Sequence, residues 1–382
     1  MKRLWTRSFI GLILVLFFLC FGFYLLLPTL PIYIKELGVN ESNIGLIIGL
    51  YTLAAVVVRP FVGGLLDHFG RRIFIIIGLI LFALSMYLYI WVSGIVMLIL
   101  LRIFHGFSWA VSTTSIGTSI TDVIPASRRG EGMGWYGLSM SVSMAIGPMI
   151  GVWVARSYSF SNLFLLATAF TVIALLLALM SKVQFSRKKQ TGKIELFDKS
   201  LTSICVVMFF LTIAFGGITT FLPLFAESIK VNPGTFFLLY AITLTISRPV
   251  AGKLADRYSE GTVIIPSLII TIAALLILSL SRESFGIMAS AILYGIGFGA
   301  AQPPLLALTL RLVPSNKKGV ANASFFTAID LGIGLGAIIL GFVSPLGYSF
   351  LFTVCVVSGL ISLLIFISYV RKQLNGLKTL RP

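Results

Sequence analysis

Two ionisable side chains of opposite charge lie deep inside long apolar segments of this 382-residue chain. Arg102 falls within segment 95–121, and Asp330 within segment 319–343. An ionised carboxylate is costly in such surroundings, so Asp330 is a candidate proton carrier, cation-binding group or partner of Arg102. Because Arg stays protonated at essentially any pH, the carboxyl is the group that titrates in such a pair. The alternatives are a structural contact between helices for Asp330 and a side chain that reaches the membrane surface for Arg102.

His105 follows Arg102 by about one helical turn. An unperturbed imidazole titrates near neutral pH, which makes His105 a candidate for a proton relay. The alternative is a histidine that only forms a structural hydrogen bond within its helix.

Other patterns that carry chemistry are absent from the chain. It contains no Gly-x-x-x-x-Gly-Lys-Ser phosphate loop, no His-Glu-x-x-His zinc motif and no nucleophile elbow. The three cysteines lie in apolar segments without neighbouring Cys or His, which argues against disulfides and a metal site: Cys20, Cys205 and Cys355. We therefore expect no enzyme activity, no cofactor and no bound metal, and a gradient as the energy source.

The composition places these residues in a membrane. Hydrophobic residues make up 58% of the chain and charged residues 11%, well below a soluble domain. A spanning helix needs about 20 apolar residues, and a barrel would alternate apolar and polar residues, which this chain does not. The sequence predicts an all-α integral membrane protein with twelve spans at 9–34, 41–66, 73–93, 95–121, 131–155, 161–181, 200–226, 234–255, 262–280, 284–311, 319–343 and 346–370.

The chain repeats itself at an offset of 189 residues. Arg59-Pro60-x-x-Gly63-x-Leu65-x-Asp67 recurs as Arg248-Pro249-x-x-Gly252-x-Leu254-x-Asp256, although the second copy continues with Ser259-Glu260-Gly261 in place of Gly-Arg-Arg. The same offset relates Tyr51 to Tyr240 and Gly106 to Gly295. Two homologous membrane halves are typical of transporters. We expect six-helix bundles at 1–181 and 201–382, joined by a polar cytoplasmic linker at 182–200.

The net charge of +17 is distributed according to membrane topology. If the N-terminus is cytoplasmic, 22 of the 29 Lys and Arg fall in cytoplasmic loops and tails and four in outer loops. This bias predicts that both termini are cytoplasmic and that the basic excess contacts anionic lipid headgroups. Nucleic-acid binding is disfavoured. We expect a multi-pass protein of a bacterial cell membrane that functions as a monomer.

The loop between the second and third spans carries a family resemblance. Its sequence from Gly63 to Arg72, GGLLDHFGRR, resembles the signature of the major facilitator superfamily, with His68 where the pattern usually has Arg. The resemblance covers the whole chain and implies twelve helices in two pseudo-symmetric halves. It also implies a conformational latch in the outward-open state. That latch would comprise Gly63, Asp67, Gly70, Arg71, Arg72 and, at the end of the fourth span, Asp122.

Two further segments resemble motifs of this superfamily. Arg102-x-x-His105-Gly106 resembles a fourth-helix motif with Gln at the His position, which implies a role for Arg102 in proton coupling. Gly147-Pro148-x-x-Gly151 resembles the core of an antiporter motif, and implies a bend and a close contact between the fifth and eighth spans. The alternative is ordinary packing of small residues.

In this fold the first, fourth, seventh and tenth helices line the substrate cavity. Their polar or aromatic side chains, which suit amphipathic organic molecules, include Tyr24, Trp109, Phe215, Tyr294 and Gln302. The resemblance therefore predicts proton-coupled export of a small organic or drug-like compound, as in multidrug antiporters. A proton symporter that imports a small metabolite is the alternative. Many drug exporters carry an acid in the first helix and none lies in 9–34 here, which departs from the standard drug-antiporter pattern. A membrane sensor built on this fold is a third reading.

Overall fold

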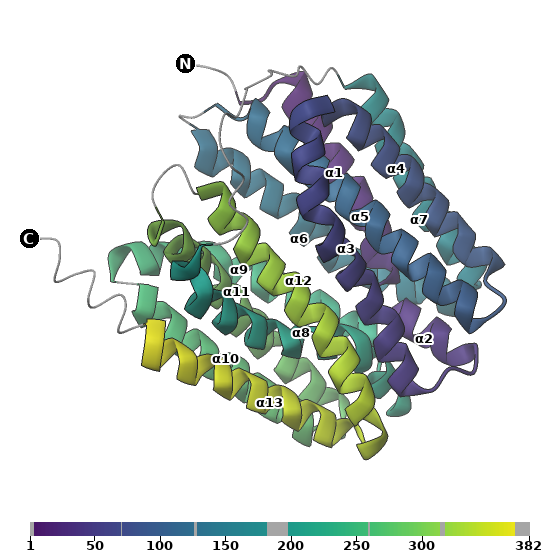
Figure 1. The fold of residues 1–382 in the computed structure, drawn as a ribbon. Helices are drawn as coiled ribbons and strands as arrows, with labels where there is room; N and C mark the ends of the chain where they lie inside the picture. Colours follow the sequence, from purple (N-terminus) through teal and green to yellow (C-terminus); the bar gives the residue numbers. More distant parts are fainter. Residues whose placement is uncertain are drawn as a thin grey trace, which may run out of the picture. The chain divides into compact units, whose positions relative to one another are not determined.

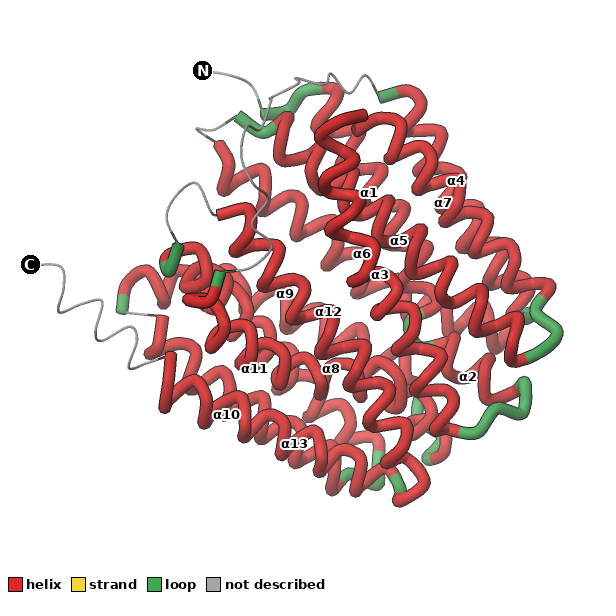
Figure 2. Tube along the Cα trace, viewed as in Figure 1, coloured by secondary structure: helices red, strands yellow, loops and turns green. Residues whose placement is uncertain are grey.

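A computed structural model describes residues 4–69, 71–125, 128–181, 198–258, 260–313 and 318–370. Within these ranges the chain forms helices and the turns between them, with no β-strand (Figure 2). Twelve of the described helices are long and apolar enough to cross a membrane. The predicted all-α membrane fold is thereby confirmed.

The helices of the first half are labelled in Figure 1. They are α1 (Arg7–Leu26), α2 (Thr29–Glu36), α3 (Glu41–Phe69), α4 (Arg71–Leu88), the short η1 (Tyr89–Trp91), α5 (Ile95–Val123), α6 (Arg129–Ser157) and α7 (Phe160–Met180). Capping side chains define several of the starts. The hydroxyl of Thr6 accepts a hydrogen bond from the amide of Phe9, and Ser159 does the same for Asn162.

The second half repeats this order. It comprises η3 (Lys199–Leu201), α8 (Thr202–Ser228), α9 (Pro233–Arg257), α10 (Glu260–Leu280), α11 (Ser284–Arg311), α12 (Lys318–Val343), η5 (Ser344–Leu346), α13 (Tyr348–Ile365) and η6 (Phe366–Val370). Asn232 caps α9, and Pro233 follows at its first position, where the missing N–H costs nothing. Residues 182–197 of the predicted linker lie outside the described residues.

The first predicted span differs from the structure in one respect. The segment 9–34 is not one helix, because α1 ends at Leu26 and the short α2 begins at Thr29. Pro28 lies between them and Pro31 in the first turn of α2. Proline has no N–H to donate to the preceding turn, and its ring clashes with that turn, so the helix stops where the first proline enters.

The chain divides into two compact units, one of residues 1–39 and 50–192, the other of residues 40–49 and 193–382. In the first unit α1 packs against α6 and α7, and α4 packs against α5 and α7. In the second unit α8 packs against α12 and α13, and α10 against α11 and α13, which lies beside it in Figure 1. Each contact of one unit thus has its counterpart in the other, as the internal repeat predicts.

A repeated glycine explains part of this symmetry. A Cβ atom at Gly106 in α5 would lie 2.1 Å from the carbonyl oxygen of Tyr51 in α3. At the equivalent Gly295 in α11, it would lie 2.6 Å from the carbonyl oxygen of Tyr240 in α9. Both halves therefore bring two helix backbones together where only glycine fits.

A row of serines on α5 satisfies its own hydroxyl groups. Ser112 donates to the carbonyl of Ser108 at 2.8 Å, Ser115 to that of Val111 at 2.6 Å, and Ser119 to that of Ser115 at 2.8 Å. These serines are fully buried. Because each hydroxyl donates a hydrogen bond to a carbonyl of the preceding turn, the row packs in an apolar interior without leaving these hydroxyl groups unpaired.

Candidate functional site

The signature loop of the first half ends in an ion pair. Nε of Arg71, in the first turn of α4, lies 3.0 Å from Oδ2 of Asp122 near the end of α5. Arg71 also donates to the carbonyl of Leu66, and Arg72 to that of Leu179 in α7 at 3.1 Å. These bonds tie the start of α4 to three other helices of the same bundle.

The remaining residues of the predicted latch lie largely outside the described part of the chain. Gly63 and Asp67 belong to the last turns of α3, but the surroundings of these residues are not described, and Gly70 lies outside the described residues altogether. The structure therefore brings Arg71 and Asp122 together and leaves the partner of Asp67 open.

The second half carries a matching ion pair. Nη1 of Arg311, at the end of α11, is paired with Oε1 of Glu260 at the start of α10. These residues stand 189 positions after Asp122 and Arg71, so the pair is conserved between the halves with its charges exchanged. The sequence comparison missed this relationship because Glu260 interrupts the repeated motif.

The first bundle contains a polar group of three buried side chains: Arg102, Tyr89 and His105. The hydroxyl of Tyr89 lies 3.0 Å from Nδ1 of His105 and accepts a hydrogen bond from Nη1 of Arg102 at 3.4 Å. The guanidinium carbon of Arg102 also lies 4.4 Å from the centre of the Tyr51 ring, which attracts the positive charge. Arg102 and His105 are both buried, so Arg102 is held within the bundle and does not extend to its surface.

Aromatic rings also pack against His105. The ring centres of Tyr51 and Phe82 lie 4.8 Å and 4.9 Å from that of His105, both edge-on. One turn further along α5, Trp109 stacks on Phe23 of α1 at 4.4 Å. Trp109, predicted to line the substrate cavity, is thus buried in an aromatic cluster.

The second bundle holds the same aromatic arrangement. Tyr294 lies 5.6 Å from Tyr240 and stacks on Phe298, also at 5.6 Å, and Phe298 in turn stacks on Phe215 at 5.3 Å. By the offset of 189, Tyr294 corresponds to His105, Tyr240 to Tyr51, and Phe298 to Trp109. Tyr294 and Phe215, both predicted cavity residues, therefore belong to one cluster.

The polar part of the arrangement exists only in the first bundle. The repeat equivalents of Arg102 and Tyr89 are Ala291 and Leu278. A guanidinium buried among apolar groups is stable only when neighbouring side chains supply hydrogen bonds or a polarisable face. The first bundle supplies both through Tyr89 and Tyr51, and the second has no cation at this position that would need them.

The predicted antiporter segment packs against α1. A Cβ atom at Gly147 would lie 2.9 Å from Cβ of Tyr24, and one at Gly151 would lie 2.1 Å from the carbonyl oxygen of Leu25. Pro148 is buried between the two glycines within α6. Both glycines thus lie in close contact with the first span, whereas the predicted contact between the fifth and eighth spans, which belong to different units, stays a prediction. The contact with the first span also positions Tyr24, a predicted cavity residue.

Asp330 occupies the middle of α12 and is half-buried in the second unit. Its helix is held against α8 by glycines: a Cβ atom at Gly332 would lie 2.1 Å from Oγ1 of Thr212, and one at Gly336 would lie 2.5 Å from the carbonyl oxygen of Ile213. The principal neighbour of α12 in the second unit is thus α8, the seventh span. Arg102 and Asp330 belong to different units.

Gln302, the last predicted cavity residue, is hydrogen-bonded within the second bundle. Its Oε1 accepts a bond from Nη2 of Arg248 at 2.7 Å. Arg248 belongs to the repeated Arg-Pro motif on α9, so Gln302 links α11 to that motif. This bond uses one of the two lone pairs of the amide oxygen and none of the amide N–H groups.

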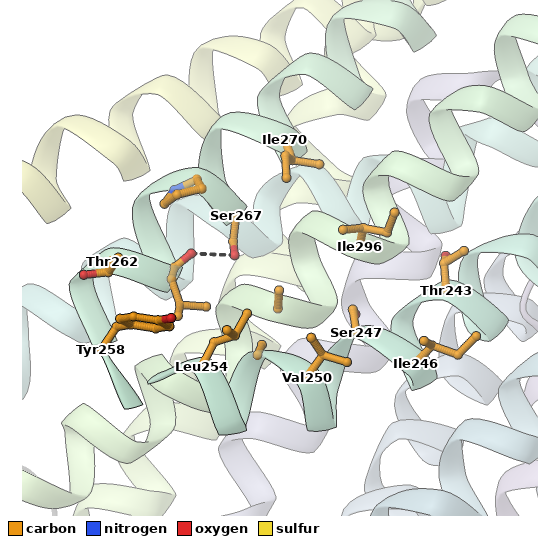
Figure 3. A pocket seen from close by; sticks show the side chains of 14 residues that line it. Thr243, Ile246, Ser247, Val250, Leu254, Tyr258, Thr262, Ser267, Ile270 and Ile296 are labelled. Atoms are coloured by element: carbon orange, nitrogen blue, oxygen red, sulfur yellow. Dashed lines mark hydrogen bonds between the residues drawn. The ribbon is translucent and has the colours of Figure 1, made fainter. Parts of the chain in front are cut away.

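A groove of about 590 Å³ lies between α9, α10 and α11 (Figure 3). Its lining is almost wholly apolar, with Val250 and Leu254 of α9 on one side and Ile270 of α10 on the other. The predicted site residues do not line it. The groove is therefore separate from the aromatic cluster on the same helix, α11.

Comparison with known proteins identifies the family. The model of the Major Facilitator Superfamily matches residues 12–337, and a second match spans residues 204–381. The chain belongs to this superfamily. A signature loop, twelve apolar helices and an internal repeat thus coincide with a match across nearly the whole chain.

Individual members of the Major Facilitator Superfamily align over most of the chain. The staphylopine export protein of Staphylococcus aureus is 26% identical over 370 residues, covering 90% of this chain and 90% of that protein. The quinolone resistance protein NorA of the same species is 26% identical over 346 residues, covering 85% and 87%. A solved structure of a bacterial homologue of the human lysosomal transporter Spinster superposes with a TM-score of 0.80 at 13% identity, covering 97% and 98%.

Sequence reasoning within this superfamily missed Tyr89, which holds the polar group together. No pattern marks it, because it follows α4 by one residue and reaches Arg102 across a turn. The aromatic neighbours were accessible from the repeat, since the offset of 189 already relates Trp109 to Phe298. Only their packing shows that they form equivalent clusters.

Proposed function

We propose that this protein exports a small organic compound in exchange for protons by alternating access of its two six-helix halves. The observation that carries the proposal is the alignment of nearly the whole chain with two proteins named for export and for drug resistance. The antiporter-like segment Gly147–Gly151 supports the same direction. An aromatic, weakly charged lining suits a drug-like substrate.

Asp330 is the proposed proton carrier. It is the acid nearest the middle of a span, and only a carboxyl or imidazole among the buried groups titrates in a useful range. Arg102 supplies a permanent positive charge in the other half. If Asp330 proves structural, His105 is the next candidate for the proton only if His105→Gln, which cannot titrate, also abolishes transport.

The proposed latch operates at the Asp67 end of the first half, which we place in the cytoplasm together with both termini. Asp67 is the acid in the last turn of α3, and Arg71 and Arg72 begin α4 four and five residues later. The ion pair of Arg71 with Asp122 supports this assignment, because it fixes the basic start of α4 against the end of α5. By the family resemblance, Gly63 and Gly70 complete the proposed latch.

The proposed substrate contacts are Tyr24, Trp109, Phe215, Tyr294 and Gln302, the last of which also accepts a hydrogen bond from Arg248. We further propose a monomer whose basic cytoplasmic face contacts anionic lipids, and no catalytic role. Import by proton symport is the second candidate, favoured by the lack of an acid in the first span.

Export and import are separated by a transport assay. First, deletion and overexpression strains are screened for altered resistance to a compound panel, with metabolites measured in the medium. The compound found is then tested in inverted membrane vesicles that carry an inward-acidic proton gradient. Accumulation, with proton release on substrate addition, supports export. Uptake into whole cells that is driven by an inward proton gradient establishes the symporter instead.

A further inference from the structure

Tyr89 places its hydroxyl group within hydrogen-bond distance of both Arg102 and His105. It is fully buried, at the point where α4 passes into η1. Its hydroxyl oxygen lies 3.4 Å from Nη1 of Arg102 and 3.0 Å from Nδ1 of His105. These distances place one hydroxyl between a group that only donates hydrogen bonds and a group that donates or accepts according to its tautomer.

Counting donors and acceptors identifies the tautomer. The guanidinium of Arg102 must donate, so the oxygen of Tyr89 accepts, and its single hydrogen is left to point at His105. If Nδ1 of His105 is unprotonated, it accepts that hydrogen, and the ring carries its own hydrogen on Nε2. The opposite tautomer would leave two groups without partners, the hydroxyl hydrogen of Tyr89 and a bare Nε2, whereas the first leaves only Nε2–H. Each buried unpaired polar group is costly, so the first arrangement is favoured.

The surroundings of His105 also disfavour a second positive charge. The titratable and charged side chains that face it are Arg102 on its own helix, Tyr51 on α3 and Tyr89 after α4. The other rings that face it are Phe82 of α4 and Phe23 of α1, which are apolar. Arg102 is the charged group of this set, and it repels an imidazolium.

Nε2 of His105 is buried and has no hydrogen-bond partner among the described residues. The repeat-equivalent position holds a second such atom, because the hydroxyl of Tyr294 is also buried without a partner. Both atoms lie within equivalent aromatic clusters. Buried polar atoms without partners are rare, and two at matched positions point to a group that is supplied from outside the bundle.

We propose that Tyr89 is a positioning residue that fixes His105 in the Nε2–H tautomer, and that His105 thereby serves transport as a hydrogen-bond donor rather than as a proton carrier. Its ligand is an acceptor oxygen of the substrate, such as a carboxylate or carbonyl oxygen. The proposal deepens the proposed transport function and rests on it for the ligand, but the tautomer is a property of the protein alone.

The tautomer is tested by nitrogen NMR on full-length protein with ¹⁵N-labelled histidine in lipid nanodiscs. The chain has only two histidines, so the signals of His105 are those that disappear in His105→Gln. We expect an unprotonated Nδ1 and a protonated Nε2 at neutral pH. Tyr89→Phe, which keeps the ring, should yield a mixture of tautomers. Tyr87→Phe, on an exposed position of α4, is the matched control and should leave the spectrum unchanged.

A protonated Nδ1 in the native protein, or an unchanged spectrum in Tyr89→Phe, would overturn the positioning role. Because this measurement uses no substrate, its failure is distinguishable from failure of the transport function.

The donor role is tested by transport of the compound that the resistance screen finds. Gln carries an N–H at a comparable reach but does not titrate, whereas Met has similar bulk and no donor. We expect His105→Gln to retain transport within about threefold and His105→Met to raise KM about tenfold or more, as for the loss of one buried hydrogen bond. Equal loss in both variants would make His105 a proton carrier, and no loss in either would reduce it to packing.

Discussion

Glu260 and Arg311 form an ion pair at the position where the first half has Arg71 and Asp122, with the two charges exchanged. In both halves the pair joins the first residue of one helix to the end of the next, α4 to α5 and α10 to α11. What the two halves share at this end is therefore an opposite-charge contact between neighbouring helices. The sign of each partner is free to change provided that both change.

The exchanged pair predicts a rescue. Glu260→Arg places two cations together and should lower both thermal stability and transport, as should Arg311→Glu, which pairs two anions. The double variant restores the opposite charges and should recover most of the loss. Because the side chain of Arg311 is 59% exposed, we expect neutral Glu260→Gln to cost no more than about 1 kcal/mol. Thermal unfolding in detergent measures these effects.

Lys253→Glu, on an exposed position of α9, serves as the control for net charge in that series. A double variant no more stable than either single reversal would show that the pair contributes nothing to stability.

Asp67→Asn tests the proposed latch. The variant should insert and accumulate normally, because the change is isosteric and lies at the end of α3. Transport should fall strongly, since closure of the cytoplasmic end loses its charge partners. Asp122→Asn, which removes the acid that pairs with Arg71, should cause a smaller loss. Surface amount and initial transport rate are measured together, and full transport by Asp67→Asn at normal abundance would refute the latch.

Asp330→Asn should separate proton coupling from substrate binding. The amide keeps the shape of the carboxyl but does not titrate, so concentrative transport should be abolished while counterflow, which needs no proton gradient, continues. Arg102→Ala should damage both, because it also removes the bonds to Tyr89 and the contact with Tyr51. Transport is measured against pH, with counterflow in parallel. A normal pH profile in Asp330→Asn would assign that residue to helix packing.

Gly106→Ala should destabilise the first bundle. The added methyl would lie 2.1 Å from the carbonyl oxygen of Tyr51, so the backbones of α3 and α5 must move apart, at a cost of about 1–3 kcal/mol. Gly117→Ala, on the same helix, is the matched control, since its methyl would meet only Tyr136 at 3.6 Å, an ordinary contact. Thermal unfolding of the two variants should differ clearly. Equal stability would mean that the close approach is not required.

Several features of the protein follow from local sequence alone. The number and length of the spans are determined by apolar runs, because an unsatisfied backbone in lipid leaves the helix as the only structure for such a run. The similarity of the halves follows from the offset of 189, which relates Gly106 to Gly295 across loops and spans alike. The break at Pro28 was missed although its cause is local, since the apolar run continues through it.

The tertiary structure alone decided which side chains meet. Tyr89 contacts Arg102 and His105 because the turn after α4 folds α5 back alongside it. No periodicity within either helix predicts that contact. Gly147 faces α1 because the rotation of a helix that is apolar on all sides is selected by packing, not by a hydrophobic stripe. The pair of Glu260 with Arg311 joins two helix ends that lie 51 residues apart in the sequence. The two ends meet whichever of the two residues carries the positive charge, so the contact is kept in the second half although the repeated motif is not.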